Sequence, residues 1–330
     1  MVYLLVDSSG FGGIESHIQQ LALLLRSQRI EVEVVYLRHY PSHPQYAQLE
    51  RQQIPYRFLS SYSLIGFFKN LAATDVVHAH GYKASILSRC CRLLARYHLV
   101  TTYHAGESVS GRLACYEWLN RYTGWLSYNL AVSTKIKRHQ PFHCELLRNF
   151  VACDGSPPNR QRHSQLQVGF VGRLSHEKGI DRFIAINQHT VGCEFHVYGD
   201  GEQSYLLEGA GVKWHGAVPS MVPHWQELDV LLITSRAEGM PMAALEAMSH
   251  GVVVISTDVG EMPALVDNCC LVAEDNWQQL SFKLEQCVNE PAEFWLALSR
   301  QQQQLVKANY SGEACWQQLA KIYRLHSASS

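Results

Sequence analysis

The chain has 330 residues, of which 47% are hydrophobic and 17% charged, a composition that excludes a disordered protein. Its length predicts two domains, since a single core seldom grows beyond about 250–300 residues, and no apolar run approaches the roughly 18 residues that cross a bilayer. The net charge is −1, and ten scattered cysteines without a Cys-x-x-Cys pair favour reduced thiols and a cytoplasmic protein.

The small net charge hides an asymmetry between the halves. Residues 1–150 contain 16 Lys and Arg against 9 Asp and Glu, a net charge of +7, and residues 151–330 contain 12 against 20, a net charge of −8. The basic half is suited to an anionic membrane or an anionic substrate. Attraction between the two halves explains the same asymmetry, and both interpretations stay open.

Apolar segments alternate with helical patterns through the first half. The expected strands lie at 2–6, 32–37, 75–80, 98–104 and 128–133, and the expected helices at 14–28, 83–97 and 112–126. This alternation predicts βαβ units, and the continuous apolar strands predict a parallel sheet covered on both faces.

A second alternating series follows a segment rich in Pro, Asn, Gln and Ser. Its expected strands lie at 166–172, 193–201, 212–216, 228–234 and 252–257, its helices at 180–189 and 241–251, and three more helices fill 276–326. We therefore expect a first domain (1–150), a linker (151–165), a second domain (166–308) and a C-terminal helix (309–330). The fold class is α/β, with two tandem Rossmann-like doubly wound domains that face each other across a cleft.

Ligands of such sheets bind beyond the carboxyl ends of the strands, so the loops there carry the candidate site. In the first domain, Gly12 and Gly13 precede a helix and can admit an anion, although a tight turn explains them equally well. His78 and His80 follow one strand and His104 and Glu107 the next. A histidine there is often structural, but His104 can also donate to a sugar hydroxyl.

In the second domain, the segment "VGFVGRLSHEKGID" ends a strand at Gly172 and places Arg173 and Lys178 ahead of a helix. Two cations beside a glycine turn are suited to a diphosphate. Solvated surface cations are the alternative.

The segment "SRAEGMPMAALEAMSHG" carries the most specific pattern. Glu238 and Glu246 are eight residues apart, and Pro241 is expected as the first helical residue. Glutamates in these places can accept hydrogen bonds from the hydroxyls of a sugar and a ribose. Taken singly, each glutamate is more often a solvated or salt-bridged acid.

Backbone groups between these acids are the expected partners of phosphate. The N–H groups of Gly239, Met240 and Met242 precede the helix, near the positive end of its dipole. Together with the two glutamates and the two cations, they predict a nucleotide diphosphate sugar as the ligand.

These segments resemble glycosyltransferase family 4, which comprises retaining enzymes of the GT-B fold. The resemblance covers almost the whole chain and includes "GGIE", "DVVHAHG", "VGFVGRLSHEKGID", "YGDGE" and "EGMPMAALEAMSHGVVVISTDVGEMPALV". It implies that 1–150 is the acceptor-side domain, that 166–308 is the nucleotide-sugar-binding domain, and that the last helix, 309–330, returns to the first domain. Phe150 stands where the family often has glycine, and the first domain is short, which puts the acceptor site and one donor contact in question.

The resemblance also implies roles for the site residues. Glu246 would hold the donor ribose, while Glu238 and the backbone of 239–242 (Gly239, Met240, Pro241 and Met242) would contact the sugar and diphosphate. Arg173 and Lys178, next to Gly172, would neutralise the leaving diphosphate. His104 would contact the sugar near the reacting carbon, and Gly12 and Gly13 would approach the phosphates or the acceptor.

A mechanism follows as a hypothesis. No Asp-x-Asp motif is present, so no metal is expected. With no placed second carboxylate for double displacement, the acceptor is expected to attack from the leaving-group face.

Several assignments stay open from the sequence. The donor is expected to be a UDP-sugar, with GDP-mannose next, and the acceptor a glycan or lipid-linked sugar of a surface polysaccharide such as lipopolysaccharide. An epimerase or hydrolase of similar build and a non-catalytic nucleotide-sugar sensor are the alternatives. An anionic membrane surface is a further candidate partner, through 83–98 or 133–143, and nucleic acid is not expected.

Overall fold

The computed structural model describes residues 1–8, 10, 12–41, 43–59, 63–104, 111–151 and 162–325, without the side chains of residues 112 and 113. The chain divides into two compact units. The first comprises Met1–Ala152 with Gly312–Ser330, and the second Cys153–Ser311. Glu107 and residues 152–161 of the expected linker lie outside the described part of the chain.

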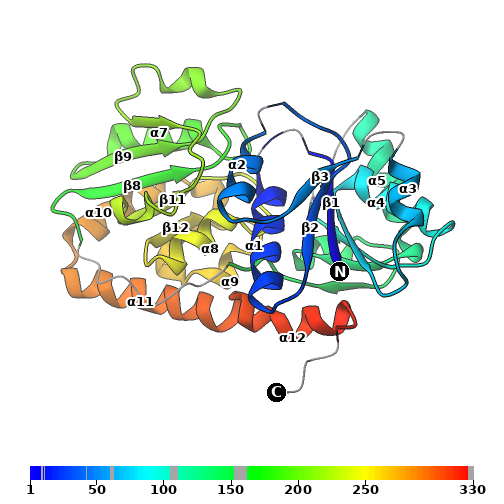
Figure 1. The fold of residues 1–330 in the computed structure, drawn as a ribbon. Coiled ribbons are helices and arrows are strands. Elements are labelled where there is room, and N and C mark those ends of the chain that lie inside the picture. Colours follow the sequence, from blue (N-terminus) through cyan, green and yellow to red (C-terminus); the bar gives the residue numbers. More distant parts are fainter. Residues whose placement is uncertain are drawn as a thin grey trace. The chain divides into compact units, whose positions relative to one another are not determined.

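The first unit is built on a seven-stranded parallel sheet in the order β3-β2-β1-β4-β5-β6-β7 (Figure 1). Its strands are β1 (Val2–Val6), β2 (Val32–Tyr36), β3 (Tyr56–Phe58), β4 (Val76–His80), β5 (His98–Tyr103), β6 (Tyr128–Ala131) and β7 (Cys144–Leu146). Its helices are α1 (Gly13–Ser27), α2 (Pro44–Arg51), α3 (Leu64–Lys69), α4 (Tyr82–Arg92), α5 (Arg112–Tyr122), the 3-10 turn η1 (Gly124–Leu126), α6 (Thr134–Arg138) and α12 (Gly312–Ile322).

The second unit is built on a six-stranded parallel sheet in the order β10-β9-β8-β11-β12-β13. Its strands are β8 (Leu166–Val171), β9 (Cys193–Tyr198), β10 (Lys213–Gly216), β11 (Val230–Ile233), β12 (Val253–Thr257) and β13 (Leu271–Val272). Its helices are α7 (Ile180–His189), α8 (Met242–Ser249), α9 (Met262–Leu265), α10 (Gln279–Asn289) and α11 (Ala292–Asn309), with the 3-10 turns η2 (Ser204–Leu207), η3 (Trp225–Glu227), η4 (Asn268–Cys270) and η5 (Glu274–Asn276).

Both sheets place a topological switch point beside their first strand. In the first unit β1 pairs with β2 on one side and β4 on the other, and in the second β8 pairs with β9 and β11. The order is that of doubly wound folds, which confirms the predicted fold class. Central strands such as β2 and β4 are buried throughout, as expected of strands covered on both faces.

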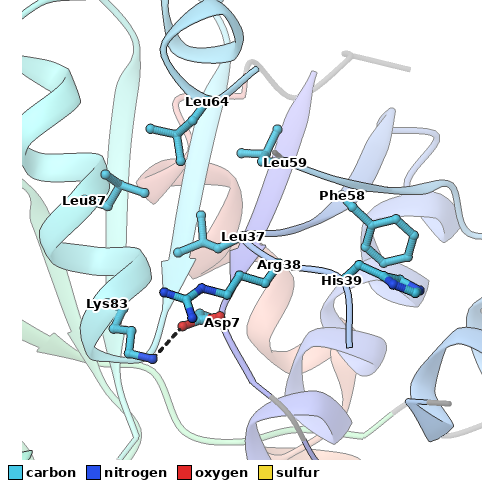
Figure 2. A pocket seen from close by; sticks show the side chains of 9 residues that line it. All are labelled: Asp7, Leu37, Arg38, His39, Phe58, Leu59, Leu64, Lys83 and Leu87. Carbon is cyan, nitrogen blue, oxygen red and sulfur yellow. Dashed lines mark hydrogen bonds and ion pairs between the residues drawn. The ribbon is translucent and has the colours of Figure 1, made fainter. Parts of the chain in front are cut away.

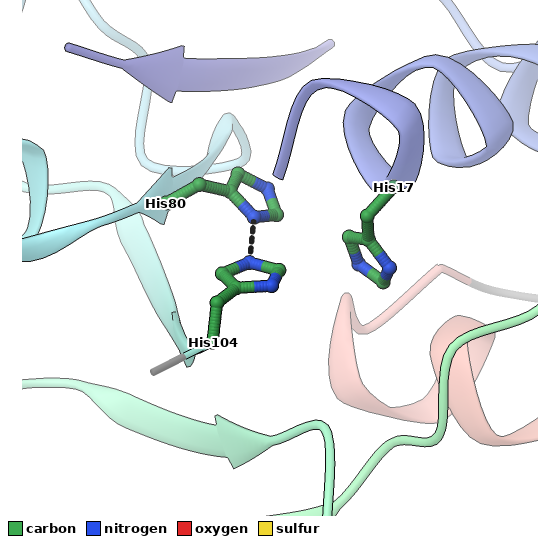
Figure 3. A group of neighbouring side chains, drawn as sticks. All are labelled: His17, His80 and His104. Carbon is green, nitrogen blue, oxygen red and sulfur yellow. Dashed lines mark hydrogen bonds between the residues drawn. The ribbon is translucent and has the colours of Figure 1, made fainter. Parts of the chain in front are cut away.

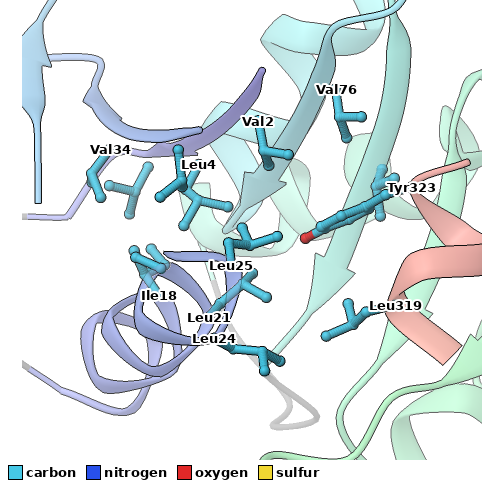
Figure 4. Packing of buried hydrophobic residues seen from close by; sticks show 14 of the residues in the cluster. Val2, Leu4, Ile18, Leu21, Leu24, Leu25, Val34, Val76, Leu319 and Tyr323 are labelled. Atoms are coloured by element: carbon cyan, nitrogen blue, oxygen red, sulfur yellow. The ribbon is translucent and has the colours of Figure 1, made fainter. Parts of the chain in front are cut away.

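The last helix completes the core of the first unit. On α1, Leu21 and Leu25 repeat at helical spacing and face the sheet, and on α12 Leu319 repeats with Cys315 in the same cluster (Figure 4). Tyr323 directly follows α12. Its hydroxyl oxygen lies 2.6 Å from Nδ1 of His78 and forms a hydrogen bond with it. The C-terminal helix therefore belongs to the first unit, as expected.

Two expectations for the first unit need correction. The helix predicted over 112–126 ends at Tyr122, and after Thr123 the chain continues as the 3-10 turn η1. Glycine fits at 124 because a Cβ there would lie 2.9 Å from the Tyr103 hydroxyl. Arg89, in the helix considered for membrane contact, is buried and cannot face a membrane. Its guanidinium donates to Thr101 Oγ1 at 2.7 Å and to Asn120 Oδ1 at 2.9 Å, so it holds α4 to its neighbours.

Candidate functional site

The loops that follow β8 and β11 meet at the switch point of the second sheet. Gly179 has a left-handed backbone (φ +72°), and a Cβ there would lie 2.2 Å from the Thr234 carbonyl oxygen. The Thr234 hydroxyl donates to the Gly179 carbonyl at 2.8 Å. Only glycine permits this approach, and it fixes the backbone beside Lys178 against the loop that carries Glu238.

Lys178 and Glu238, two of the predicted site residues, form an ion pair at this point. The Lys178 ammonium donates to Glu238 Oε1 at 2.5 Å, and the Ser235 hydroxyl donates to the same oxygen at 2.7 Å. The Glu238 side chain is only 8% exposed, against 30% for Lys178. Because an ammonium has three donors, this bond leaves two that can reach a ligand.

The loop that carries Glu238 is also held by the end of β12 and by the segment that follows it. A Cβ on Gly260, whose φ is +59°, would lie 2.3 Å from the Gly239 carbonyl oxygen, which accepts from the Glu261 N–H at 2.9 Å. The Thr257 hydroxyl donates to the Ser235 carbonyl at 2.7 Å. These supports make the turn a rigid element before the helix.

The start of α8 differs by one residue from the prediction. Pro241 has ψ of 121° and is the N-cap, so the helix begins at Met242. The first helical hydrogen bonds run from Ala244 and Leu245 to the Pro241 carbonyl. Proline serves here because its missing N–H has no helical partner to lose. The N–H groups of Met242 and Ala243 precede any helical acceptor, at the positive end of the dipole.

The other predicted donor residues have clear places in the second unit. The side chains of Met240 and Met242 are buried and anchor the turn, whereas Glu246, one turn into α8, is half-buried. Arg173 is 69% exposed and its ion pair with Glu177 is 3.8 Å long, so solvent screens it. Gly172 follows β8. The backbone of Gly199 passes close to it, since a Cβ added to Gly199 would lie 1.9 Å from the Gly172 carbonyl oxygen.

Three histidines gather at the carboxyl edge of the first sheet (Figure 3). His80 ends β4, His104 follows β5, and His17 comes from α1; Nδ1 of His80 lies 3.0 Å from Nε2 of His104. Burial lowers the pKa of His17 to about 4 and holds the pKa of His80 and His104 well below the usual range. The cluster is therefore neutral at pH 7.

His78 is separate from this chemistry. It lies on β4, where Nδ1 bonds the Tyr323 hydroxyl at 2.6 Å and Nε2 bonds the Thr102 hydroxyl on β5 at 2.6 Å, so one nitrogen holds the end of α12 and the other holds the neighbouring strand. This is the structural role that the sequence left open for a histidine at a strand end.

The three clustered histidines are also the group with metal-ligand spacing in the described ranges. One nitrogen of each lies within 4.8 Å of the others, a donor set that Zn²⁺ accepts. The bond between His80 and His104 uses Nδ1 of His80 and Nε2 of His104 and leaves the second nitrogen of each ring outside this bond. The group contains no carboxylate or thiolate to offset the charge of a buried ion.

The glycine turn before α1 is partly occupied by the chain itself. The N–H of Gly12 donates to Glu15 Oε2 at 2.7 Å, and Glu15 is buried. That N–H is therefore engaged by the helix cap. At Gly13 an added Cβ would meet nothing within 4 Å, so internal packing does not require glycine there.

Sequence reasoning missed Ser235 and Gly260 at the carboxyl edge of the second sheet, and His17 at the carboxyl edge of the first sheet. Ser235 sits in the loop that the sequence singled out, but its contact with Glu238 needs the loop conformation. Gly260 lies in "STDVGEMP", part of a segment that resembles the family. The glycine itself was the signal that a close backbone approach could occur there. His17 follows "GGIES" on a helix, where the sequence gives no indication that it reaches β4 and β5.

Two family models match separate parts of the chain. Residues 11–140 match Glycosyltransferase Family 4, and residues 165–290 match Glycosyl transferases group 1. The chain belongs to glycosyltransferase family 4. This membership confirms the resemblance on which the roles of the site residues rest. The roles themselves stay predictions.

Curated relatives of this family 4 chain include proteins of polysaccharide and lipid glycosylation. WbnH, an O-antigen biosynthesis glycosyltransferase of Escherichia coli, is 25% identical over 160 residues, 47% of this chain and 47% of WbnH. The gpi3 subunit of phosphatidylinositol N-acetylglucosaminyltransferase from Schizosaccharomyces pombe is 26% identical over 304 residues, 77% of this chain and 65% of gpi3. The match spans about half the length of WbnH.

Solved structures share the whole fold of the family 4 chain. HepE of Anabaena in complex with UDP and glucose superposes with a TM-score of 0.80 at 18% identity, over 98% of this chain and 99% of HepE. TarM of S. aureus, in a complex that contains UDP, gives 0.80 at 11% identity, over 98% of this chain and 99% of TarM. At these identities the likeness establishes the GT-B fold alone.

Within the ranges that the structure describes, no helix is both long enough and apolar enough to traverse a bilayer.

Proposed function

We propose that this family 4 chain is a retaining, metal-independent hexosyltransferase. It moves a sugar from a UDP-sugar to a glycan or lipid-linked acceptor in surface polysaccharide synthesis of the O-antigen or lipopolysaccharide kind. The observation that carries the proposal is the Lys178–Glu238 pair, held at a switch point next to the N-terminus of α8. The UDP in the HepE and TarM complexes and the O-antigen role in the name of WbnH support the donor and the pathway.

The donor is proposed to lie at the second sheet. The two remaining donors of Lys178 and the N–H groups of Met242 and Ala243 would bind the diphosphate, where a helix N-terminus favours an anion. Arg173 would add a second, more exposed cation. Glu238, fixed by Lys178 and Ser235, would accept from sugar hydroxyls with its second oxygen, and Glu246 would accept from the ribose hydroxyls.

The proposed reaction breaks the bond between the anomeric carbon and the β-phosphate oxygen. The bonding electrons go to the diphosphate, whose growing charge Lys178, Arg173 and the helix amides stabilise. The acceptor hydroxyl attacks from the same face, forms the new C–O bond and gives its proton to the departing phosphate. Glu238 is a poor nucleophile for double displacement, because it is buried and already accepts two hydrogen bonds on one oxygen.

We propose two roles for the first unit in the same reaction. His104, neutral and oriented by His80, would donate a hydrogen bond to the transferred sugar. Gly12 and Gly13 would leave room for the donor phosphates or the acceptor, a role that the open space at Gly13 supports.

The first unit is also proposed to dock on the cytoplasmic face of an anionic membrane. Lys135, Lys137 and Arg138 are exposed on α6, and Trp118 (58% exposed) and Trp125 (66% exposed) belong to the adjacent α5 and η1. The guanidinium of Arg121 on α5 donates to the carbonyl of His139 after α6, which ties the two regions together. Cations beside exposed indoles are suited to an anionic lipid interface.

A thermal-shift panel tests the donor assignment. UDP and UDP-glucose are expected to raise the unfolding temperature more than GDP and GDP-mannose, because a ligand of the native state stabilises it in proportion to its affinity. No shift with any uridine nucleotide would overturn the donor. For retention, the anomer first formed from the sugar donor in the presence of acceptor is read by NMR, and an inverted product would overturn the stereochemistry.

Liposome flotation tests the membrane surface. Vesicles with anionic phosphatidylglycerol are expected to carry the protein, and neutral phosphatidylcholine vesicles are not. The triple change Lys135→Ala, Lys137→Ala and Arg138→Ala should abolish the difference. Equal recovery with both kinds of vesicle would overturn the docking.

A further inference from the structure

A pocket of about 660 Å³ opens at the carboxyl edge of β1, β2 and β3, within the first unit (Figure 2). It lies between these strand ends and the helices α3 and α4, and none of the residues assigned above to the donor lines it. Its volume is in the range of sites that hold small organic ligands. Its wall has a distinct apolar part and a distinct charged part.

The apolar part is built from five side chains on four elements. They are Leu37 after β2, Phe58 and Leu59 at the end of β3, Leu64 on α3 and Leu87 on α4. Phe58 is 38% exposed although it is a large apolar residue. Apolar side chains that converge on an open recess are expected to bind an apolar group, since covering them removes that surface from water.

The charged part lies at the other end of the recess, where Asp7, Arg38 and Lys83 gather (Figure 2). Lys83 donates to Asp7 Oδ2 at 2.9 Å and the Tyr40 hydroxyl donates to Oδ1 at 2.7 Å, so both oxygens of this buried carboxylate are engaged. Arg38 is exposed and forms no ion pair with the residues that the structure describes.

The charges that line the pocket favour an anion. Asp7 offsets Lys83, which leaves the guanidinium of Arg38 as an excess positive charge, and the ring of His39 lies beside Phe58. Lys83 is in the first turn of α4, where the helix dipole is also positive. A guanidinium binds phosphate oxygens through two parallel hydrogen bonds.

We infer that this pocket binds an amphiphile in which a phosphate group is joined to a hydrocarbon chain. The phosphate lies at Arg38 and Lys83, and the chain lies along Leu37, Leu64 and Leu87. Under the proposed function, on which this last step rests, the ligand is the acceptor, which is thereby assigned to lipid phosphates. Binding of the amphiphile itself does not depend on that step.

Calorimetry with dodecyl phosphate below its micellar concentration tests the inference on the full chain. Dodecyl phosphate is expected to bind the wild type, whereas inorganic phosphate and uncharged dodecyl maltoside bind at least tenfold more weakly, because each offers only half of the chemistry. Equal binding of inorganic phosphate would mean a free-anion site and would overturn the inference. Equal binding of dodecyl maltoside would mean an apolar site without selection for phosphate, with the same consequence.

Matched variants locate the binding. Arg38→Ala should weaken dodecyl phosphate about tenfold, the loss of one charge-assisted contact, and Leu87→Glu should abolish binding by placing a carboxylate in the apolar part. Arg96→Ala is the control, because Arg96 is also exposed but precedes β5, at the amino edge of the same sheet. If Arg38→Ala bound like Arg96→Ala, the inference would be wrong.

Stabilisation by UDP, measured on the same preparations, separates the two proposals. Lost binding of the amphiphile with intact UDP stabilisation would overturn only this pocket. Absent UDP stabilisation with intact amphiphile binding would overturn only the donor site. Circular dichroism and the unfolding temperature are measured for each variant as controls of folding. A loss of binding in a folded variant is then assigned to the changed side chain.

Discussion

The two sheets have the same order around their first strand but carry different chemistry at the switch point. In the second unit the edge holds charges, with Lys178 bonded to Glu238 at 2.5 Å beside a helix N-terminus. In the first unit it holds the neutral imidazoles of His80 and His104, 3.0 Å apart, together with the ion pair of Asp7 and Lys83. The carboxyl edge of the second sheet is thus an electrostatic site for a phosphate, whereas that of the first sheet adds uncharged hydrogen-bonding imidazoles to a charged pair.

The largest expected effect comes from removing the ammonium group of Lys178 at the carboxyl edge of the second sheet. Lys178→Ala should lower kcat/KM at least 100-fold, since stabilisation of charge in a transition state by one group is often worth about 3 kcal/mol. Lys213→Ala is the matched control, because Lys213 pairs with Glu194 at 2.7 Å on the same sheet without lying at the switch point. Equal effects of the two substitutions would remove the special role of Lys178.

Stability should distinguish the glycines of the two edges. Gly260→Ala would place a Cβ in a left-handed residue 2.3 Å from the Gly239 carbonyl, and the free energy of unfolding is expected to fall by about 2 kcal/mol or more. Gly13→Ala, with nothing within 4 Å of the new Cβ, should change it by less than about 0.5 kcal/mol. Urea denaturation measures both, and the reverse order would contradict the described packing.

The clustered histidines at the carboxyl edge of the first sheet should make the free energy of unfolding depend on pH. His17 has a pKa of about 4 in the folded chain against 6.5 for an ordinary histidine, so its contribution is complete above pH 6.5. As pH falls from 6.5 towards 4 the unfolded chain takes up the proton first, and stability should drop by about 3 kcal/mol.

The variant His17→Phe isolates this residue from carboxylates that titrate in the same window. Its phenyl ring suits the neighbouring Phe150, and its free energy of unfolding should fall less between pH 6.5 and 4 than that of the wild type. Identical pH profiles of the two proteins would contradict the desolvated state of His17.

The smallest effect is expected from metal removal. EDTA should leave transferase activity unchanged, because the diphosphate is proposed to be neutralised by Lys178, Arg173 and helix amides. Activity that falls on chelation and returns with Zn²⁺ would instead assign the three histidines of the first edge as metal ligands.

Local signals predicted much of the second edge from the sequence. Gly172, Lys178 and the Glu238–Glu246 segment stand where strands end, so their common edge followed from the alternation of strands and helices. The contact of Lys178 with Glu238 joins residues 60 positions apart and depends on β8 pairing with β11, which periodicity alone does not specify.

Signals were weaker where structure depends on packing across elements. The edge strands β3, β7 and β13 have two or three residues each, too few for a hydrophobic period. His17 reaches the other histidines only because α1 packs beside β4 and β5, and the pocket at Arg38 combines four short segments. Such features need the tertiary arrangement before they can be recognised.

Hydrogen–deuterium exchange of the wild type with and without UDP tests the central claim most directly. The account predicts that UDP slows exchange in 172–179 and in 235–246, the two loops of the second edge and the first turns of α8, and that Lys178→Ala weakens this protection. Protection confined to other segments, or unchanged exchange in both loops at saturating UDP, would contradict it.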